Sequence, residues 1–356
     1  MNMIPIAEHD SWLSLDTMWG CPNSCGYCFL RNAGLAGIAP KICFPLDNSL
    51  RNKIVSVLHD CPQDVPICIG NYTDMLANED MRNRLYETAR FISCIDPLRL
   101  IVIISKSKIS KTIAQNISEA TAGRGLIILS QSFSKDYNVT IEKGSISSPD
   151  ETYQSLEVIS STEGLEAAHF WRPFLFKWNS TKDISDRIHK LKNSGCNCSI
   201  VIGLKGDMHM IRSYSNEFCS CANSEIALDG VHGDERIIEE LLNDLLNTAK
   251  ECDYPVYRHT SCAVALIQNS PDINGTSKSS FKTANCDKVS CPKQQRIICD
   301  NDPLLNDNEM PIFDEINEFE YTHFVHIYHR SPLAKKVYLQ KVWKGNIISE
   351  VKNGYI

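Results

Sequence analysis

Hydrophobic residues in this chain fall into short continuous runs that alternate with longer segments of mixed character. A continuous apolar run of about four to eight residues between turn residues is typical of a parallel strand buried on both faces. Such runs predict six strands, at residues 11–16, 65–70, 98–105, 125–130, 167–174 and 198–203. The longer segments predict six helices, at residues 48–59, 78–92, 108–121, 149–160, 181–194 and 235–252.

Strand–helix units joined by short connections predict an α/β fold, in which helices cover a parallel sheet. The pattern alone does not separate an open sheet from a sheet that curves into part of a barrel. In parallel barrels, the residues that bind and react lie at the carboxyl ends of the strands. The segments that directly follow the expected strands are therefore where we look for chemistry.

A loop after the first expected strand carries three cysteines, Cys21, Cys25 and Cys28, with the spacing Cys-x3-Cys-x2-Cys. Three thiolates on one tight loop can hold three irons of a cubic iron–sulfur cluster, whereas four-cysteine sites are closed. A metal site with an open position can bind substrate and react. The alternatives are a zinc site or unrelated buried thiols, since the chain has 16 cysteines. A zinc site would need a fourth ligand nearby, and no histidine stands at a suitable spacing.

The cysteine segment resembles the cluster-binding loop of the radical S-adenosylmethionine enzymes, down to the aromatic Tyr27 before the third cysteine. The resemblance implies that residues 1–252 form a partial (β/α)6 TIM-like barrel, and that residues 253–356 form a C-terminal extension. It further implies a 4Fe-4S cluster on the three cysteines and S-adenosylmethionine on its open iron. Reductive cleavage of that cofactor would release a 5′-deoxyadenosyl radical, which abstracts hydrogen from a substrate. An electron donor such as flavodoxin or ferredoxin is then expected.

Two strand ends resemble the spore photoproduct lyase-like branch of that family. The segment from Gly70 to Asp74 lacks the common Gly-Gly-Glu sequence and is similar to the Gly-x-x-x-Asp variant of this branch. Asp74 is then expected to accept the ammonium group of the cofactor, or alternatively it belongs to a turn that begins a helix. The tripeptide Ser105-Lys106-Ser107 resembles the Thr-Lys-Ser of the branch. This places Lys106 on the cofactor side, with a solvated loop residue as the alternative.

The next two strand ends carry polar residues suited to the remaining parts of the cofactor. Hydroxyl groups fit the ribose of the adenosyl group. Because strand residues alternate between faces, Ser130 and Ser132 share a face and Gln131 lies opposite, and we expect the serines to point inward. Arg172 ends the fifth strand, and its planar guanidinium can pair with the methionine carboxylate.

A second set of four cysteines lies in the C-terminal extension, with the spacing Cys-x23-Cys-x4-Cys-x7-Cys. Four thiolates suit a closed 4Fe-4S cluster or a tetrahedral zinc ion, and a reducing compartment disfavours disulfides. Members of the family often carry an auxiliary cluster, so a second 4Fe-4S cluster is expected, with zinc or unligated thiols as alternatives. The expected ligands are Cys262, Cys286, Cys291 and Cys299, for the first of which Cys219 or Cys221 could substitute.

The net charge of the chain disfavours nucleic acid as a partner. The net charge is −7 and the pI about 5.8, without the basic stripe of proteins that grip nucleic acid. No apolar run is long enough to span a bilayer and the start lacks signal-peptide features, so a cytoplasmic protein is expected. The expected substrate is a small molecule, a nucleotide-like compound or a peptide. The alternatives are sulfur insertion or methylthiolation that uses the auxiliary cluster, or a non-enzymatic iron–sulfur or zinc-binding protein.

Overall fold

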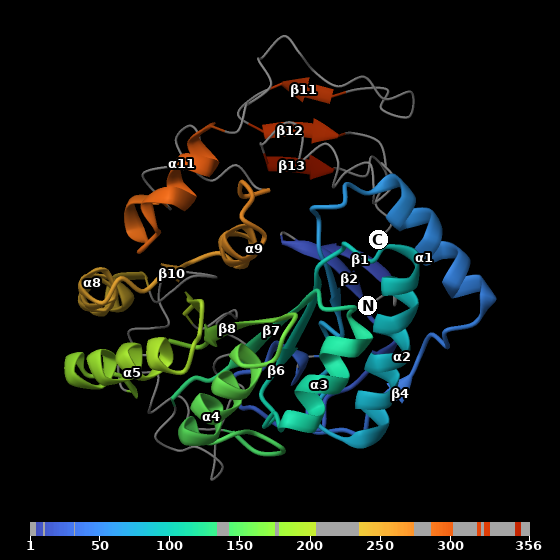
Figure 1. Cartoon of the computed structure of the whole chain (residues 1–356), viewed down its shortest axis with the longest axis horizontal. Helices are drawn as coiled ribbons and strands as arrows, with labels where there is room; N and C mark the ends of the chain where they lie inside the picture. Colours follow the sequence, from blue (N-terminus) through green and yellow to red (C-terminus); the bar gives the residue numbers. More distant parts are fainter. Residues whose placement is uncertain are drawn as a thin grey trace.

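The computed structural model describes residues 5–9, 11–31, 33–133, 142–174, 178–203, 235–273, 286–301, 319–321, 324–327 and 346–349. Its centre is an eight-stranded sheet (Figure 1). In spatial order the strands are β1 (Ile6–His9), β2 (Trp12–Leu15), β5 (Ile67–Ile69), β6 (Ile101–Ser105), β7 (Gly125–Ser130), β8 (Leu165–Trp171), β9 (Cys198–Val201) and β10 (Val256–Tyr257). Only β1 runs antiparallel to its neighbour, and the other seven strands are parallel.

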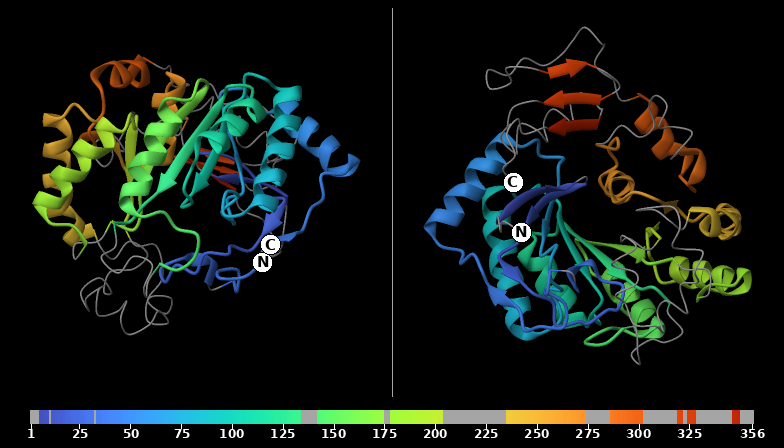
Figure 2. Two further views of the ribbon diagram at one scale, coloured as in Figure 1. Left: turned by 60° about the horizontal axis from the view of Figure 1, so that its bottom comes forward. Right: turned by 180° about the vertical axis from the view of Figure 1, so that it is seen from behind.

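The six predicted strands all form, as β2 and β5 to β9. The sheet curves so that helices lie outside it and its other face points inward, as Figure 2 shows from two further sides. This arrangement confirms the partial barrel. Two strands of the eight-stranded sheet were not predicted, because they are short and lie at its edges. They are β1, which folds back on β2, and the two-residue β10.

Helices cover the outer face of the sheet (Figure 1). They are α1 (Asn48–Asp60), α2 (Glu79–Ile95), α3 (Lys111–Ala120), α4 (Pro149–Ser160), α5 (Thr181–Asn193) and α8 (Glu235–Glu251). Side-chain caps fix several starts, including Ser110, which accepts from the backbone of Ile113 and makes α3 begin later than predicted. Ser148 and Glu151 form a capping box that starts α4 at the predicted residue.

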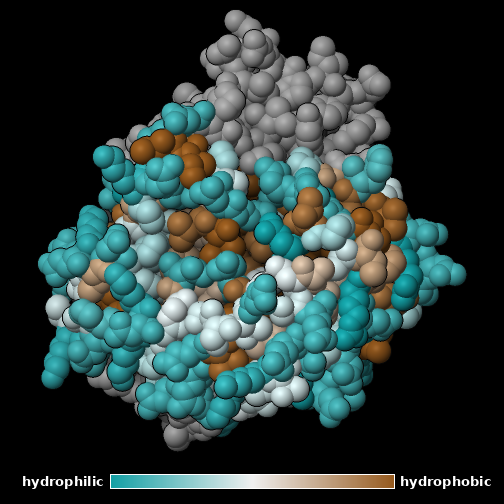
Figure 3. All heavy atoms as spheres, in the orientation of Figure 1, coloured by the Kyte–Doolittle hydropathy of each residue, from teal (hydrophilic) through white to brown (hydrophobic). Residues whose placement is uncertain are grey.

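The two faces of the sheet pack into separate apolar layers. Outward residues of the strands, such as Leu13, Ile103 and Ile127, pack against the helices in the larger layer. Inward residues such as Val102 and Ile128 pack against α9 (Thr260–Gln268) in the smaller one. In Figure 3 hydrophilic residues cover most of the outer helices, and hydrophobic residues gather near the centre of the view.

The C-terminal part contains α11 (Lys293–Asn301) and a separate sheet of β11 (Phe319–Tyr321), β12 (Phe324–Ile327) and β13 (Asn346–Ser349). Because β10 pairs with β9, residues 256–257 belong to the barrel sheet, and the division at residue 252 stays a prediction. No helix in the described ranges has the length and apolar character of a membrane span.

A buried arginine joins the loops at the amino-terminal ends of β5 and β6. Arg99 is 2% exposed, and its Nε donates to the Asp96 carboxylate at 2.8 Å. Its remaining nitrogens donate to four backbone carbonyls, those of Leu58, Cys61, Pro62 and Val65. One side chain therefore satisfies several carbonyls that would otherwise be buried without donors.

Replacing Arg99 with methionine should lower the free energy of unfolding by about 3 kcal/mol, since the carbonyls and Asp96 lose their donors. Urea denaturation followed by circular dichroism measures the change. Arg124→Met is the matched control, because exposed Arg124 donates to a single carbonyl, that of Leu98. Its effect should stay within about 0.5 kcal/mol. Equal effects of the two substitutions would contradict the role assigned to Arg99.

Candidate active site

The cysteine loop follows β3 (Met18–Trp19), which pairs with β4 (Lys41–Ile42). Gly20 enters it with φ +101°, a conformation that favours glycine. The loop closes on itself through Cys21, whose N–H donates to Leu35 at 2.7 Å and whose carbonyl accepts from Ile38 at 3.1 Å. Cys28 N–H donates to Cys25 at 3.2 Å. These backbone bonds hold the three cysteines on one compact turn.

The three thiols are shielded from solvent. Cys21 and Cys25 are buried and Cys28 is half-buried. Burial raises the pKa of Cys21 to about 11 and that of Cys25 to about 12, and it also raises the pKa of Cys28. Such thiols ionise only when a metal or another cation stabilises the thiolate.

No group of three or more His, Cys, Asp or Glu side chains in the described ranges converges closely enough to hold a single metal ion. A cubic cluster binds each thiolate through a different iron atom, so its ligands need not converge on one point. The buried loop of three thiols fits such a cluster.

Asp74 joins the cysteine loop to the end of β6. Its carboxylate accepts from Asn23 in the loop at 3.2 Å, and from Ser105 Oγ at 2.6 Å and the Lys106 N–H at 2.9 Å. The backbone N–H of Leu76 and the hydroxyl of Ser107 complete five donors. Burial raises its pKa. Protein donors thus occupy the carboxylate that was predicted to accept an ammonium group, and that role stays a prediction.

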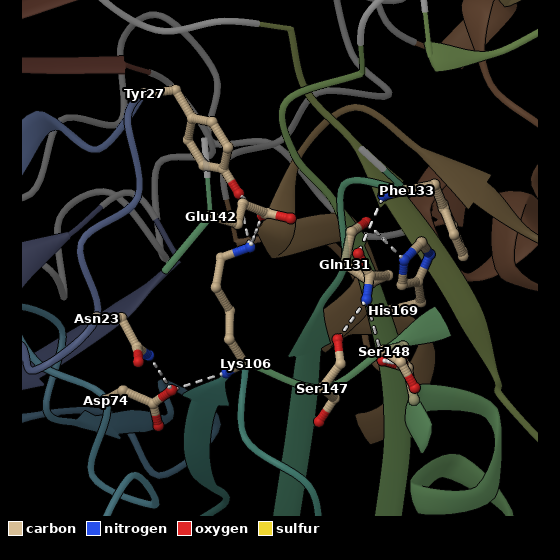
Figure 4. Close-up of polar contacts among 11 residues, drawn as sticks. Asn23, Tyr27, Asp74, Lys106, Gln131, Phe133, Glu142, Ser147, Ser148 and His169 are labelled. Atoms are coloured by element: carbon tan, nitrogen blue, oxygen red, sulfur yellow. Dashed lines mark hydrogen bonds and ion pairs between the residues drawn. The ribbon is translucent and has the colours of Figure 1, made fainter. Parts of the chain in front are cut away.

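Lys106, Tyr27 and Glu142 form a polar cluster next to the cysteine loop, to which Tyr27 belongs (Figure 4). Its Nζ donates to Glu142 Oε1 at 2.9 Å and to Tyr27 Oη at 2.8 Å, and Tyr27 also donates to Glu142 Oε1. The Ser132 hydroxyl lies within hydrogen-bonding reach of Tyr27 and Glu142. Burial lowers the pKa of Lys106, but the Glu142 carboxylate, Cys25 and Cys28 together outweigh it and the pKa rises overall. Lys106 is therefore not the solvated loop residue of the alternative interpretation.

Glu142 and Asn23 were missed by sequence reasoning. Glu142 lies well beyond the end of β7, outside any strand-end pattern, and its side chain is completely buried. Its Oε2 is buried without a hydrogen-bond partner. A single acidic residue between Ile141 and Lys143 carries no periodic or motif signal, so only the fold could reveal it.

Arg172 directly follows β8 on the inward face, beside Cys28 and Tyr27. Its guanidinium lies 5.5 Å from the centre of the Phe170 ring, and burial lowers its pKa. Within the described part of the chain, no hydrogen bond or ion pair engages this guanidinium. Its contact with the methionine carboxylate stays a prediction.

The end of β7 follows the predicted alternation. Gln131 points outward, where its amide donates to the Ser147 carbonyl at 2.9 Å (Figure 4). His169 lies on the same side, and its Nε2 donates to the Gln131 carbonyl at 3.1 Å. Burial lowers the pKa of His169 to about 3, so it is neutral at pH 7. Ser132, on the opposite face, lies in the site, and the predicted ribose contacts of Ser130 and Ser132 stay predictions.

The second cysteine set gathers around α11. Cys286, Cys291 and Cys299 are half-buried and lie close enough for each to influence the others' ionisation. Tyr257 Oη lies 3.6 Å from Cys291 Sγ, and Gln295 Nε2 donates to Cys299 Sγ at 3.4 Å. Hydrogen-bond donors around sulfur are common at iron–sulfur sites.

The fourth expected ligand, Cys262, lies in the inner apolar layer on α9. Its predicted substitutes, Cys219 and Cys221, lie outside the described residues. Figure 1 shows α11 at the upper left, α9 near the centre and β4, which pairs with the strand before the first loop, at the lower right.

Gly144 should be essential for the cysteine loop, because a Cβ there would lie 2.3 Å from Asn23 Oδ1 and φ is +126°. Gly144→Ala should lower stability by about 2 kcal/mol and reduce the iron bound after anaerobic reconstitution. Gly34→Ala is the matched control, since Gly34 has φ +67° but no atom within 4 Å of its Cβ position. Iron binding should survive there, and equal iron loss in both variants would argue against the contact.

The comparisons with known proteins agree with this geometry. No protein-family model matches the chain, and no curated protein matches it in sequence. Among solved structures, a mutant of spore photoproduct lyase with bound AdoMet and dinucleoside spore photoproduct superposes with a TM-score of 0.54 and 12% identity, over 69% of this chain and 75% of that chain. A second mutant gives a TM-score of 0.55 and 12% identity, over 70% and 76%. The lyase complexed with dinucleoside spore photoproduct gives 0.52 and 13%, over 66% and 72%. The chain therefore has the fold of spore photoproduct lyase.

Proposed function

We propose that this protein is a radical S-adenosylmethionine enzyme. The observation that carries the proposal is the loop of three cysteines, two of them buried and one half-buried, at the carboxyl ends of the strands, faced by Lys106 and Arg172. A site at this end of a parallel barrel is where chemistry is expected. The shared fold with spore photoproduct lyase supports the same conclusion.

The cluster ligands in this proposal are Cys21, Cys25 and Cys28. The cluster and S-adenosylmethionine, when bound, would supply radical chemistry: one electron from a flavodoxin or ferredoxin would give methionine and a 5′-deoxyadenosyl radical. Hydrogen abstraction from a substrate carbon would then give 5′-deoxyadenosine.

The protein's own residues bind and orient the cofactor. Arg172 is the group proposed for the methionine carboxylate, because this half-buried residue lies beside Cys28 and has no carboxylate partner among the described residues. Lys106 is already paired with Glu142, so its charge is largely compensated. Ser130 and Ser132 are proposed for the ribose hydroxyls. Holding the reacting groups in a buried site removes much of the entropic barrier to hydrogen transfer.

The substrate class proposed is a nucleotide-like compound, a small molecule or a peptide. The solved spore photoproduct lyase structures hold a dinucleoside, which favours the nucleotide-like option. The net charge of −7 argues against an extended nucleic-acid surface.

We further propose a second 4Fe-4S cluster on the second cysteine set. Three thiols come together around α11 with donors aimed at two of the sulfurs, which supports a cluster there. Sulfur insertion would require this cluster to reach the substrate. The position of α9 and α11 away from the first loop does not favour that alternative (Figure 1).

The enzyme proposal is tested by anaerobic reconstitution and a dithionite assay for 5′-deoxyadenosine. Cys25→Ala should abolish 5′-deoxyadenosine formation, because the loop loses a cluster ligand. Cys94→Ala is the matched control, since Cys94 is an exposed thiol on α2 and its loss should leave the product level unchanged. A fully iron-loaded protein that forms no 5′-deoxyadenosine would refute the proposal.

The second cluster is tested by counting iron and sulfide. The reconstituted protein should bind about eight irons, and Cys286→Ser/Cys291→Ser should retain about four. The variant should keep the electron paramagnetic resonance signal that disappears in Cys25→Ala. About four irons in the unaltered protein would rule out the second cluster, and one zinc per chain would support the zinc alternative.

A further inference from the structure

Glu142 is the acidic side chain that pairs with the Lys106 ammonium in the polar cluster at the site. It is completely buried, pairs with Lys106 at 2.9 Å and accepts from Tyr27 through the same oxygen, Oε1. A buried carboxylate is costly unless it is paired and hydrogen-bonded. The buried Glu142 carboxylate is therefore stable only while Lys106 and Tyr27 keep their contacts with it.

The backbone around Glu142 docks directly on the cysteine loop. The carbonyl of Lys143 accepts from the Ser24 N–H at 2.7 Å, and Gly144 packs against Asn23 so closely that a Cβ would not fit. Ser24 and Asn23 lie between the first two cysteines. The segment Glu142–Gly144 thus contacts the loop through backbone, packing and the Tyr27 side chain.

The charges of Lys106 and Glu142 lie beside the cysteine loop. Lys106 and Glu142 both bond to the hydroxyl of Tyr27, which lies between Cys25 and Cys28 in the loop. Because the Glu142 side chain is completely buried and that of Lys106 is 13% exposed, solvent screens the two charges weakly. Removal of the Glu142 charge would leave Lys106 as an uncompensated cation beside the cluster ligands.

We propose that Glu142 is a positioning residue that holds Tyr27 and Lys106 against the cysteine loop. Its carboxylate also balances the charge of Lys106 beside the iron–sulfur cluster. The proposal rests on the proposed function, because it requires the iron–sulfur cluster on Cys21, Cys25 and Cys28. It concerns the reduction potential of that iron–sulfur cluster and not the rate of the reaction. A cation without its counter-charge stabilises the reduced, more negative cluster. Loss of the Glu142 charge therefore makes the cluster easier to reduce.

The test compares reconstituted Glu142→Gln with the unaltered protein by redox titration. The first cluster is identified by the electron paramagnetic resonance signal that Cys25→Ala lacks. At a fixed potential, the ratio of reduced to oxidised cluster should rise about tenfold, which is about 59 mV for a one-electron couple. Glu151→Gln is the matched control, because Glu151 pairs with Lys108 at 3.2 Å on the surface. Its titration should be unchanged.

A second variant separates charge from structure. In Lys106→Gln/Glu142→Gln both charges disappear, so the potential should return toward that of the unaltered protein. If Glu142→Gln does not load iron, loading in the double variant supports the charge balance, and failure of both variants overturns it. An unchanged potential in fully loaded Glu142→Gln also overturns the proposal while leaving the proposed function intact. A protein that binds no iron at all overturns both.

Discussion

The site depends on how charge is buried at the carboxyl ends of the strands. A buried ion is costly without a partner, and two of the three charged side chains that reach the site from strand ends are partnered within the fold. Asp74 accepts from five donors, and Lys106 is paired with Glu142. Arg172 lies beside Cys28, and no hydrogen bond or ion pair engages its guanidinium within the described residues. The fold itself therefore partners two of these three charges.

Successive strand residues alternate between the two faces of the sheet, so residues of the site point inward and the residues that hold the strand ends in place point outward. Inward residues at the strand ends, such as Lys106, Ser132 and Arg172, face the cysteine loop, while their neighbours point outward. Gln131 and His169 form part of the outward support through hydrogen bonds to each other and to the loop before α4. A one-residue shift in register would exchange these roles. The packing of both apolar layers therefore also fixes the chemistry of the site.

The two cysteine sets occupy different parts of one architecture. The first lies on a loop between β3 and β4, held by backbone bonds and by Asp74. The second lies around α11, beyond the helix α9 that fills the inner face of the sheet. Because an apolar layer covers the inner face, the second set suits a role in stability or electron supply better than contact with the substrate.

Apolar periodicity and close ligand spacing are local properties, so the sequence predicts the alternation of strands and helices, the first cysteine loop and the polar strand ends. It also predicts the opposite faces of Ser132 and Gln131, which follow from a period of two. Which charges are engaged follows from the tertiary packing instead. Glu142 reaches Lys106 and Tyr27 from a distant segment without a motif, and Asp74 is saturated by donors from three segments. Such pairings depend on how separate loops pack, which no local pattern records.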